Sequence, residues 1–311
     1  MASAQIVVQQ VLVMFLLLGV GILIRRLGWV TEEAARQFSN LLLMIVFPAL
    51  LIEVYQRPFI QEQFIDQLIS MALAVIFHLL AIAVSHLCIR PREHHAYRIE
   101  RLAAVYSNCG FMGFPLLSAL LGEEGLFYGV AFSGVFNLVF WIHGARTCSL
   151  DDRLEKKRIV LNPGCIGFLT GFILYITQLP LPSFLCETIT HVANLNTPLA
   201  MIITGVFLAD IRWKKLWDDA SIWRACLLRN MLLPLGMFVL LRCIGFASWF
   251  SGAPEIALAH LIACACPSAA STILLAAKRN MDSAHGAKIL ALSTLLSIVT
   301  LPAIVLLAQS V

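Results

Sequence analysis

Long apolar runs alternate with short polar segments along the whole chain, and this alternation is its dominant pattern. Each run holds about 17 to 26 residues, close to the ~20 that an α-helix needs to cross a bilayer. Isolated strands cannot satisfy their backbone in lipid, so we predict an all-α polytopic membrane protein. The ten predicted spans are 5–24, 38–55, 64–89, 101–121, 125–145, 163–179, 185–208, 222–245, 255–277 and 285–308.

Basic residues between the spans alternate just as regularly. The odd-numbered loops carry 19 of the 22 Lys and Arg residues, the even loops carry Arg57 and Arg242, and Arg229 lies inside a span. Because short cytoplasmic loops are enriched in Lys and Arg, we expect the odd loops in the cytoplasm and both termini outside the plasma (inner) membrane. The first run is uncharged and precedes Arg25 and Arg26, the reverse of a signal peptide, so we expect it to stay in the protein.

Composition supports this class and excludes others. The chain is 60% hydrophobic and 13% charged, which leaves no room for a sizeable soluble domain. The net charge of +4 follows from the basic loops, so we expect a lipid bilayer and no nucleic acid as partner. The nine cysteines show no metal or disulfide spacing, and no protease or zinc motif is present. We therefore predict no enzyme activity, no bound metal and no cofactor, with a sodium ion as the one candidate left open.

The most charged loop, 146–162, divides the spans into two groups of five. We predict a first repeat over 1–145, a cytoplasmic linker over 146–162 and a second repeat over 163–311. An odd number of spans per half inverts the second repeat relative to the first, as in many transporters. Two proline pairs recur at similar offsets, Pro48 with Pro198 at 150 residues and Pro115 with Pro267 at 152.

Two spans carry signals of a break. In the fourth span, Ser107, Asn108, Gly110 and Gly113 precede Pro115, which favours an unwound segment. In the ninth span, Pro267 stands among small polar residues, where a break and close helix packing are both open. Unwound backbone is tolerated in a membrane only when it lines a cavity or is buried in protein.

Several segments resemble the auxin efflux carrier family, in its bacterial, PIN-like branch. The stretch SNCGFMGFPLLSALLGEEG resembles the family motif SN-x-GF-x-G-x-PL. FSNLLLMIVFPALL resembles its second span, LNPGCIGFLTGFILYITQLPLP and TPLAMIITGVFLA its sixth and seventh, and RNMLLP its eighth. The resemblance covers nearly the whole chain.

This resemblance implies a fold of two inverted five-helix repeats, similar to that of bile-acid symporters and sodium/proton antiporters. Helices 4 and 9 would be broken and cross near the bilayer centre, and one bundle would move against the other. Family members carry organic anions such as auxin, malonate or malate. We therefore expect a secondary transporter that moves a small organic anion by alternating access.

Broken helices that meet in mid-membrane offer free N–H groups and the positive ends of helix dipoles to a carboxylate. Arg229, inside the eighth span, is either an anion partner or snorkels to the interface. Polar groups in the spans are either substrate ligands or helix-to-helix hydrogen bonds. The candidate substrate-binding residues are Ser107, Asn108, Gly110, Pro115, Asn137, Pro267, Ser268, Ser271, Thr272 and Arg229.

Alternatives remain at this stage. No aspartate lies in the core of a span, so we expect no carboxylate-driven proton exchange, whereas sodium-coupled symport through neutral oxygens stays open. A non-transporting sensor on the same frame also stays open, as does a homodimer. Plant carriers place Asn beside proline in both broken helices, but here the second has Cys266-Pro267-Ser268, which argues against auxin itself.

Overall fold

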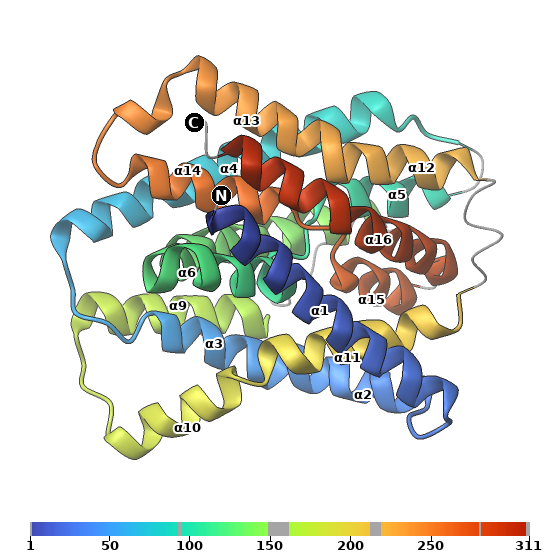
Figure 1. The fold of residues 1–311 in the computed structure, drawn as a ribbon, viewed down its shortest axis with the longest axis horizontal. Helices are drawn as coiled ribbons and strands as arrows, with labels where there is room; N and C mark the ends of the chain where they lie inside the picture. The colour runs from blue at the N-terminus through green and yellow to red at the C-terminus, as the bar shows by residue number, and fades with distance from the viewer. Residues whose placement is uncertain (1, 93–94, 149–161, 212–218, 280, 309–311) are drawn as a thin grey trace.

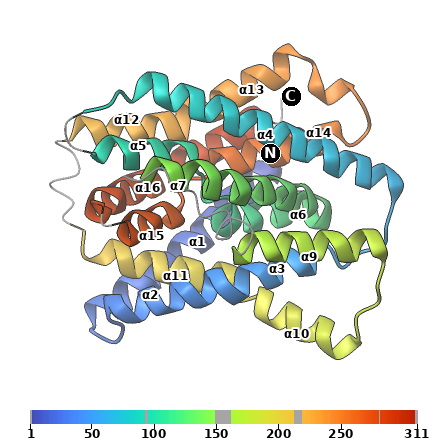
Figure 2. The same cartoon turned by 180° about the vertical axis from the view of Figure 1, so that it is seen from behind.

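The computed structural model describes residues 2–92, 95–148, 162–211, 219–279 and 281–308, and nearly all of them are helical. Figures 1 and 2 show the helices packed as long, roughly aligned rods. The helices are α1 (Ala2–Arg26), α2 (Glu32–Leu41), α3 (Phe47–Val54), α4 (Gln61–Cys88), α5 (Ala96–Val105), α6 (Phe114–Val139), α7 (Ala145–Cys148), α9 (Pro163–Thr177), α10 (Ser183–Ala193), α11 (Asn196–Ala209), α12 (Ala220–Leu227), α13 (Leu233–Cys243), α14 (Ala253–Ala265), α15 (Ala270–Lys278) and α16 (Ser283–Ala308).

Seven segments of the described chain are long and apolar enough to cross a bilayer, as expected of a multi-pass membrane protein. The segment Cys109–Cys148 is 40 residues long and contains Gly122, whose φ of 63° and ψ of −145° interrupt the helix. It therefore includes the end of the predicted fourth span and the whole fifth span. Two further apolar helices, α9 and α14, are shorter. Ten crossings thus stay a prediction, and the linker predicted over 146–162 lies mostly outside the described residues.

Three helices widen into a π-helical turn shortly before a proline. These turns are η1 (Leu42–Val46), η2 (Cys109–Gly113) and η5 (Leu228–Leu232), and each ends two residues before Pro48, Pro115 or Pro234. Proline lacks an N–H, and its ring clashes with the carbonyl four residues earlier. A wider turn relieves that clash without ending the helix. A further π turn, η3, covers Phe140–Gly144.

The helices form two bundles. The small bundle contains α1, α2–α3, α9 and α10–α11, and the large bundle contains α4–α7 and α12–α16 (Figure 1). Helices α1 and α11 cross closely because Gly21 and Gly205 face each other, and a Cβ on either would overlap the other helix's backbone. In the large bundle, α6 packs against both α4 and α14.

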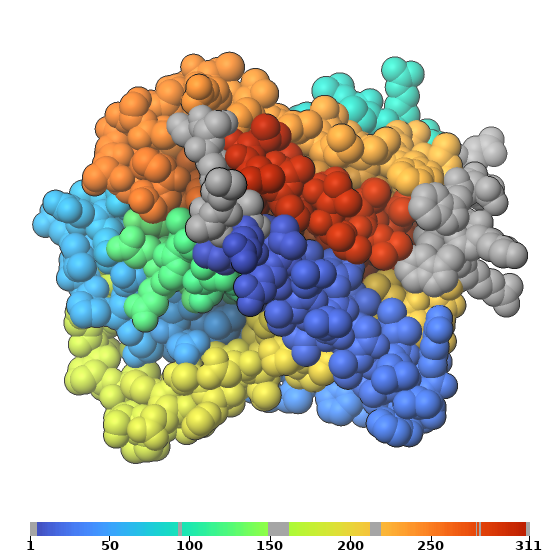
Figure 3. All heavy atoms as spheres, in the orientation of Figure 1, coloured from blue at the N-terminus to red at the C-terminus, as the bar shows by residue number. Residues whose placement is uncertain are grey.

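Basic residues are concentrated at one end of the molecule, called here the basic end, and apolar side chains are exposed along the helices between the two ends. The C-terminal ends of α1, α4, α11 and α15 lie at one end of the molecule, and the C-terminal ends of α3, α9 and α13 lie at the other (Figures 1 and 2). Each helix of the first set leads into a predicted basic loop, so these described helix ends share one side. Figure 3 shows α1 and α16 side by side on one face, where Leu16 and Val299 are both 72% exposed, as lipid-facing side chains would be.

Candidate functional site

Two helices of the large bundle are broken at points that face each other. One break lies between α5 and η2, and the other between α14 and α15. Ser107 pairs with Ser268 as an isolated antiparallel bridge. The Asn108 N–H donates to Pro267 O at 2.7 Å, and the Ala269 N–H donates to Tyr106 O at 2.9 Å. The break favoured in the fourth span and the break that the family resemblance implies in the ninth span are thus both present, and they bond to each other through their backbones.

The two hydrogen bonds are exchanged by a local two-fold rotation that swaps Ser107 with Ser268. These residues are 161 positions apart (268 minus 107), whereas the proline pair Pro115 and Pro267 is 152 apart. Pro267 lies within its break, but Pro115 lies beyond its own, near the start of α6. The two prolines are therefore not equivalent at the crossing.

Arg229 lies behind the crossing and is fully buried. Its Nη1 donates to Ala104 O at 3.0 Å and to Val105 O at 2.7 Å, and its Nη2 donates to Cys264 O. These carbonyls belong to the last turns of α5 and α14. They have no hydrogen-bond donor within their own helix, because the helix ends there. The guanidinium therefore bonds the C-terminal ends of both half-helices at once.

The opposite ends of the breaks line a cavity of about 430 Å³ between the two bundles, called here the first cavity. The first residues of η2 and α15 line it from the large bundle, and residues of α2–α3 and the start of α9 line it from the small bundle. None of the described residues that line it is charged. They are Asn40, Leu43, Met44, Phe47, Ser107, Asn108, Cys109, Gly110, Phe111, Ser133, Phe136, Asn137, Phe140, Trp141, Asn162, Pro163, Gly164, Ala269, Ala270, Ser271, Leu274 and Leu275.

Polar side chains in the first cavity are few, and several have unused hydrogen-bonding capacity. The hydroxyls of Ser107 and Ser133 are buried and have no partner among the described residues. The Asn108 side chain likewise makes no hydrogen bond within the described part of the chain. By contrast, Asn137 Nδ2 donates to Ser133 O at 2.8 Å, and Asn162 Oδ1 accepts from Gly164 N at 2.9 Å. Buried polar atoms normally have partners, so these groups keep free hydrogen-bonding capacity at the cavity wall.

A second cavity of about 790 Å³ lies between the bundles toward the other end of the molecule. It is more polar, and Glu53, Arg57 and Glu123 are among its lining residues. The first cavity instead reaches toward the basic end, at the start of α9 and along α15.

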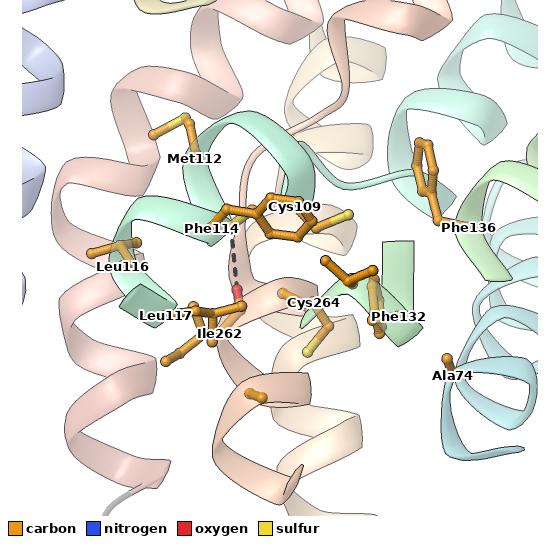
Figure 4. Close-up of a cluster of buried hydrophobic side chains, with 14 of the residues drawn as sticks. Ala74, Cys109, Met112, Phe114, Leu116, Leu117, Phe132, Phe136, Ile262 and Cys264 are labelled. Carbon is orange, nitrogen blue, oxygen red and sulfur yellow. Dashed lines mark hydrogen bonds between the residues drawn. The ribbon is translucent and has the colours of Figure 1, made fainter. Parts of the chain in front are cut away.

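A thin partition separates the two cavities. The Phe47 ring, which lines the first, stacks 6.2 Å from Phe114, which lines the second. Asn196 lines the second cavity, and its Nδ2 donates to Gly110 O, in the lining of the first, at 3.0 Å. A Cβ on Gly110 would lie 2.6 Å from the Phe47 ring, so only glycine fits there unless the ring moves. Figure 4 shows the tightly packed side chains around this region, among them Phe114, Phe132 and Ile262.

The structure separates the candidate residues into three groups. Ser107, Asn108, Gly110, Asn137 and Ser271 line the first cavity, and Pro115 lines the second. The remaining candidates make internal hydrogen bonds and are not among the lining residues of either cavity. These are Pro267, whose O accepts from Asn108 N, Ser268, whose Oγ donates to Ala103 O at 2.7 Å, Thr272, whose Oγ1 donates to Ala269 O at 2.7 Å, and Arg229.

Other lining residues were not expected from the sequence. Ser133 lies four residues before Asn137, so both occupy one face of α6, a spacing that could have suggested it. Asn162 begins the NPG segment and caps α9. Phe47 and Trp141 gave no signal, because aromatic residues in apolar runs are common in any membrane helix.

Comparisons with known proteins show which family the chain belongs to. The family model described as "Membrane transport protein" matches residues 6–153 and 152–305. An uncharacterized transporter of Methanothermobacter thermautotrophicus is 25% identical over 300 residues, which cover 94% of this chain and 96% of that protein. Another, of Methanocaldococcus jannaschii, is 25% identical over 230 residues, covering 69% and 74%. The chain therefore belongs to the membrane transport protein family, which is the auxin efflux carrier family that its motifs resemble.

Proposed function

We propose that this protein is a secondary transporter that moves a small organic anion across the plasma membrane by alternating access. The observation that carries the proposal is the composition of the first cavity. Two helix N-termini and three unpaired polar side chains face a space whose described lining holds no charged group. Each helix N-terminus acts as roughly half a positive charge, so the pair offsets about one carboxylate without the cost of burying a lysine or arginine.

The walls of the first cavity indicate the kind of anion. Phe47, Phe136, Phe140 and Trp141 line the space opposite and beside the polar groups. An apolar wall with a few convergent polar groups suits a ligand with one polar end and an apolar body. The proposed substrate is a carboxylate of modest size, such as malonate, malate or an auxin-like acid.

The proposed topology has ten crossings in two inverted repeats, over residues 1–145 and 163–311. The interruption at Gly122 and the short apolar helices α9 and α14 supply the crossings that the seven long segments lack. The antiparallel meeting of the two breaks is compatible with that inversion. The basic end is assigned to the cytoplasm and both termini to the outside, so the first cavity would open inward and the second outward.

Two cavities that are separated by the Phe47–Phe114 and Asn196–Gly110 contacts support alternating access. Both lie between the bundles, so a displacement of one bundle against the other would close one cavity and open the other. The crossing, and the anion held on it, would travel with the large bundle. The small bundle, with its close α1–α11 contact, would stay fixed.

The test is uptake of labelled organic acids into proteoliposomes, beginning with malonate, malate and indole-3-acetate. We expect at least one acid to accumulate or exchange, and Asn108→Ala to abolish that transport while the protein stays folded. Gln9→Ala is the control, because it removes an exposed amide of α1 that lines neither cavity. Failure of a broad acid panel to be transported, or unchanged transport by Asn108→Ala, would contradict the proposed function or the proposed site.

A further inference from the structure

We propose that Arg229 is a built-in cation that makes the crossing selective for anions and takes the place of a coupling cation. The inference rests on the proposed transport function and extends it to charge selectivity and energetics. Arg229 lines neither cavity, so it acts through the helices that it bonds and is a positioning residue.

Every terminal carbonyl of α5 has a partner. Ala103 O accepts from the Ser268 hydroxyl, Ala104 O and Val105 O accept from Arg229, and Tyr106 O accepts from the Ala269 N–H. Cys264 O, near the end of α14, also accepts from Arg229. Buried carbonyls must be satisfied, and one guanidinium accounts for three of these acceptors.

The same three carbonyls would suit a different occupant. Oxygen atoms from two helix C-termini that converge on one point resemble the ligand set of a hard monovalent cation, because carbonyl oxygen and negative dipole ends both favour it. The guanidinium of Arg229 already fills this position. The wild-type protein therefore has no need of a sodium ion there, and it has no room for one.

The charge of Arg229 also determines which helix ends the substrate meets. Among the described residues no carboxylate bonds to Arg229, and its guanidinium carbon lies 5.9 Å from the centroid of the Phe77 ring. Its charge is therefore balanced by the two negative half-helix ends. The two positive ends, at η2 and α15, stay uncancelled and face the first cavity. A cavity with this polarity attracts anions and repels cations.

Two consequences can be measured. Transport of the anion should not require sodium, and it should carry net negative charge because no cation accompanies the substrate. In proteoliposomes, uptake should be the same in sodium and choline salts, and an inside-positive potassium diffusion potential should accelerate it.

The decisive experiment compares Arg229→Met with wild type by thermal unfolding in sodium chloride and in choline chloride. Wild type should show no response to sodium. In Arg229→Met the three carbonyls are free, so sodium should raise the unfolding temperature progressively as its concentration exceeds its Kd. The control is Arg101→Met, since Arg101 is also buried and donates to a helix-end carbonyl, Ile89 O at 2.8 Å, but lines neither cavity. It should lower stability without creating a sodium response.

Arg229→Lys keeps the experiment decisive if the methionine variant does not fold. Lysine retains the charge, so this variant should stay indifferent to sodium and should still bind the anion. Sodium stabilisation of wild type, a sodium-indifferent Arg229→Met, or loss of anion binding in folded Arg229→Lys would each overturn the inference. The unfolding measurement needs no substrate. A sodium response in Arg229→Met alone therefore supports the built-in cation even if no acid is transported, which would refute only the proposed function.

Discussion

Ser133 is the residue of the first cavity whose role can be tested most cleanly. Its hydroxyl is buried and unpaired, while its backbone carbonyl holds Asn137. Ser133→Ala removes only the hydroxyl, so helix and neighbour stay in place. A hydrogen bond to a charged group contributes about 1.5–3 kcal/mol, and we expect anion affinity to fall about tenfold or more. Ligand-induced thermal stabilisation, titrated with the transported acid, measures the change.

Ser297→Ala is the matched control for that prediction. Ser297 is equally buried, but its hydroxyl donates to Thr294 O at 2.6 Å within α16 and lines neither cavity. Affinity should be unchanged in this variant. Equal losses in both variants would show that the effect of Ser133→Ala is a general one on packing, with no ligand contact.

At the residue scale the sequence predicted which polar residues lie at the break in the fourth span, but it did not predict which groups a buried polar side chain faces. Asn108 and Ser107 were foreseen because a polar pair beside glycines is costly in a span unless it lines a cavity. The sequence did not reveal that Arg229 faces two helix ends, because only the tertiary packing of the eighth span against the crossing determines this. Phe47 was not predicted, because its ring acts only by filling space against Gly110.

At the scale of elements, the closest contact in the small bundle depends on single glycines. A Cβ on Gly21 would overlap Ile202 O, whereas a Cβ on Gly19, in the same helix, meets nothing within 4 Å. We expect Gly21→Ala to force α1 away from α11 and to destabilise the protein by about 1–3 kcal/mol. Gly19→Ala should be neutral or stabilising by up to about 1 kcal/mol. Unfolding in detergent compares the two, and equal stability would show that the contact is not tight.

A buried carboxylate joins three elements at the basic end, outside the predicted span. Glu100 of α5 accepts from Arg224 of α12 at 2.8 Å and lies 3.5 Å from His285 of α16. Burial favours a raised pKa for Glu100, but the neighbouring His285 and the hydrogen-bonded Arg224 outweigh burial and lower the pKa below its ordinary value. A lowered pKa in the folded state stabilises the protein above the unfolded-state pKa, about 4.3.

That stabilisation should be lost as the pH falls below about 4.3 toward the lower pKa of the folded state. We therefore expect Glu100→Gln to lower the unfolding temperature at pH 7, and the difference from wild type to shrink in acid. Glu32→Gln is the control, because Glu32 forms an exposed pair with Arg36 and exposed pairs contribute little. A difference between wild type and Glu100→Gln that is independent of pH would contradict the assignment.

Element positions were largely predictable, because hydrophobic length and loop charge are local properties. The break in the fourth span was predictable for the same reason, from glycine, proline and polar residues within an apolar run. In the ninth span the residues left a break and close helix packing both open, and only the family resemblance implied the break. The contact between the two breaks was not predictable. Ser107 pairs with Ser268, and the proline pair Pro115 and Pro267 does not mark this contact, because Pro115 lies in the helix after its break. Such pairing is a tertiary property that a proline pattern does not encode.

At the scale of the whole molecule, the two cavities should be accessible from opposite sides of the membrane. Ser271 lines the first and Ser118 the second. Single cysteines can be introduced there once Cys88, Cys186 and Cys243 are replaced together with Cys109, which is buried but lines the first cavity; the other five native cysteines are buried and line neither cavity. A membrane-impermeant thiol reagent should label Ser271→Cys only from the cytoplasmic side and Ser118→Cys only from outside.

Alternating access makes a stronger prediction for these two positions than sidedness alone. Because the same movement of the bundles closes one cavity and opens the other, a transported anion should change the two labelling rates in opposite directions. The partition between the cavities determines how tightly the two labelling rates are linked. Asn196→Ala, which removes the bond to Gly110 O, should loosen this reciprocity while both sites stay reactive. Labelling of both cysteines from one side, or parallel changes with substrate, would be incompatible with two cavities that open in turn.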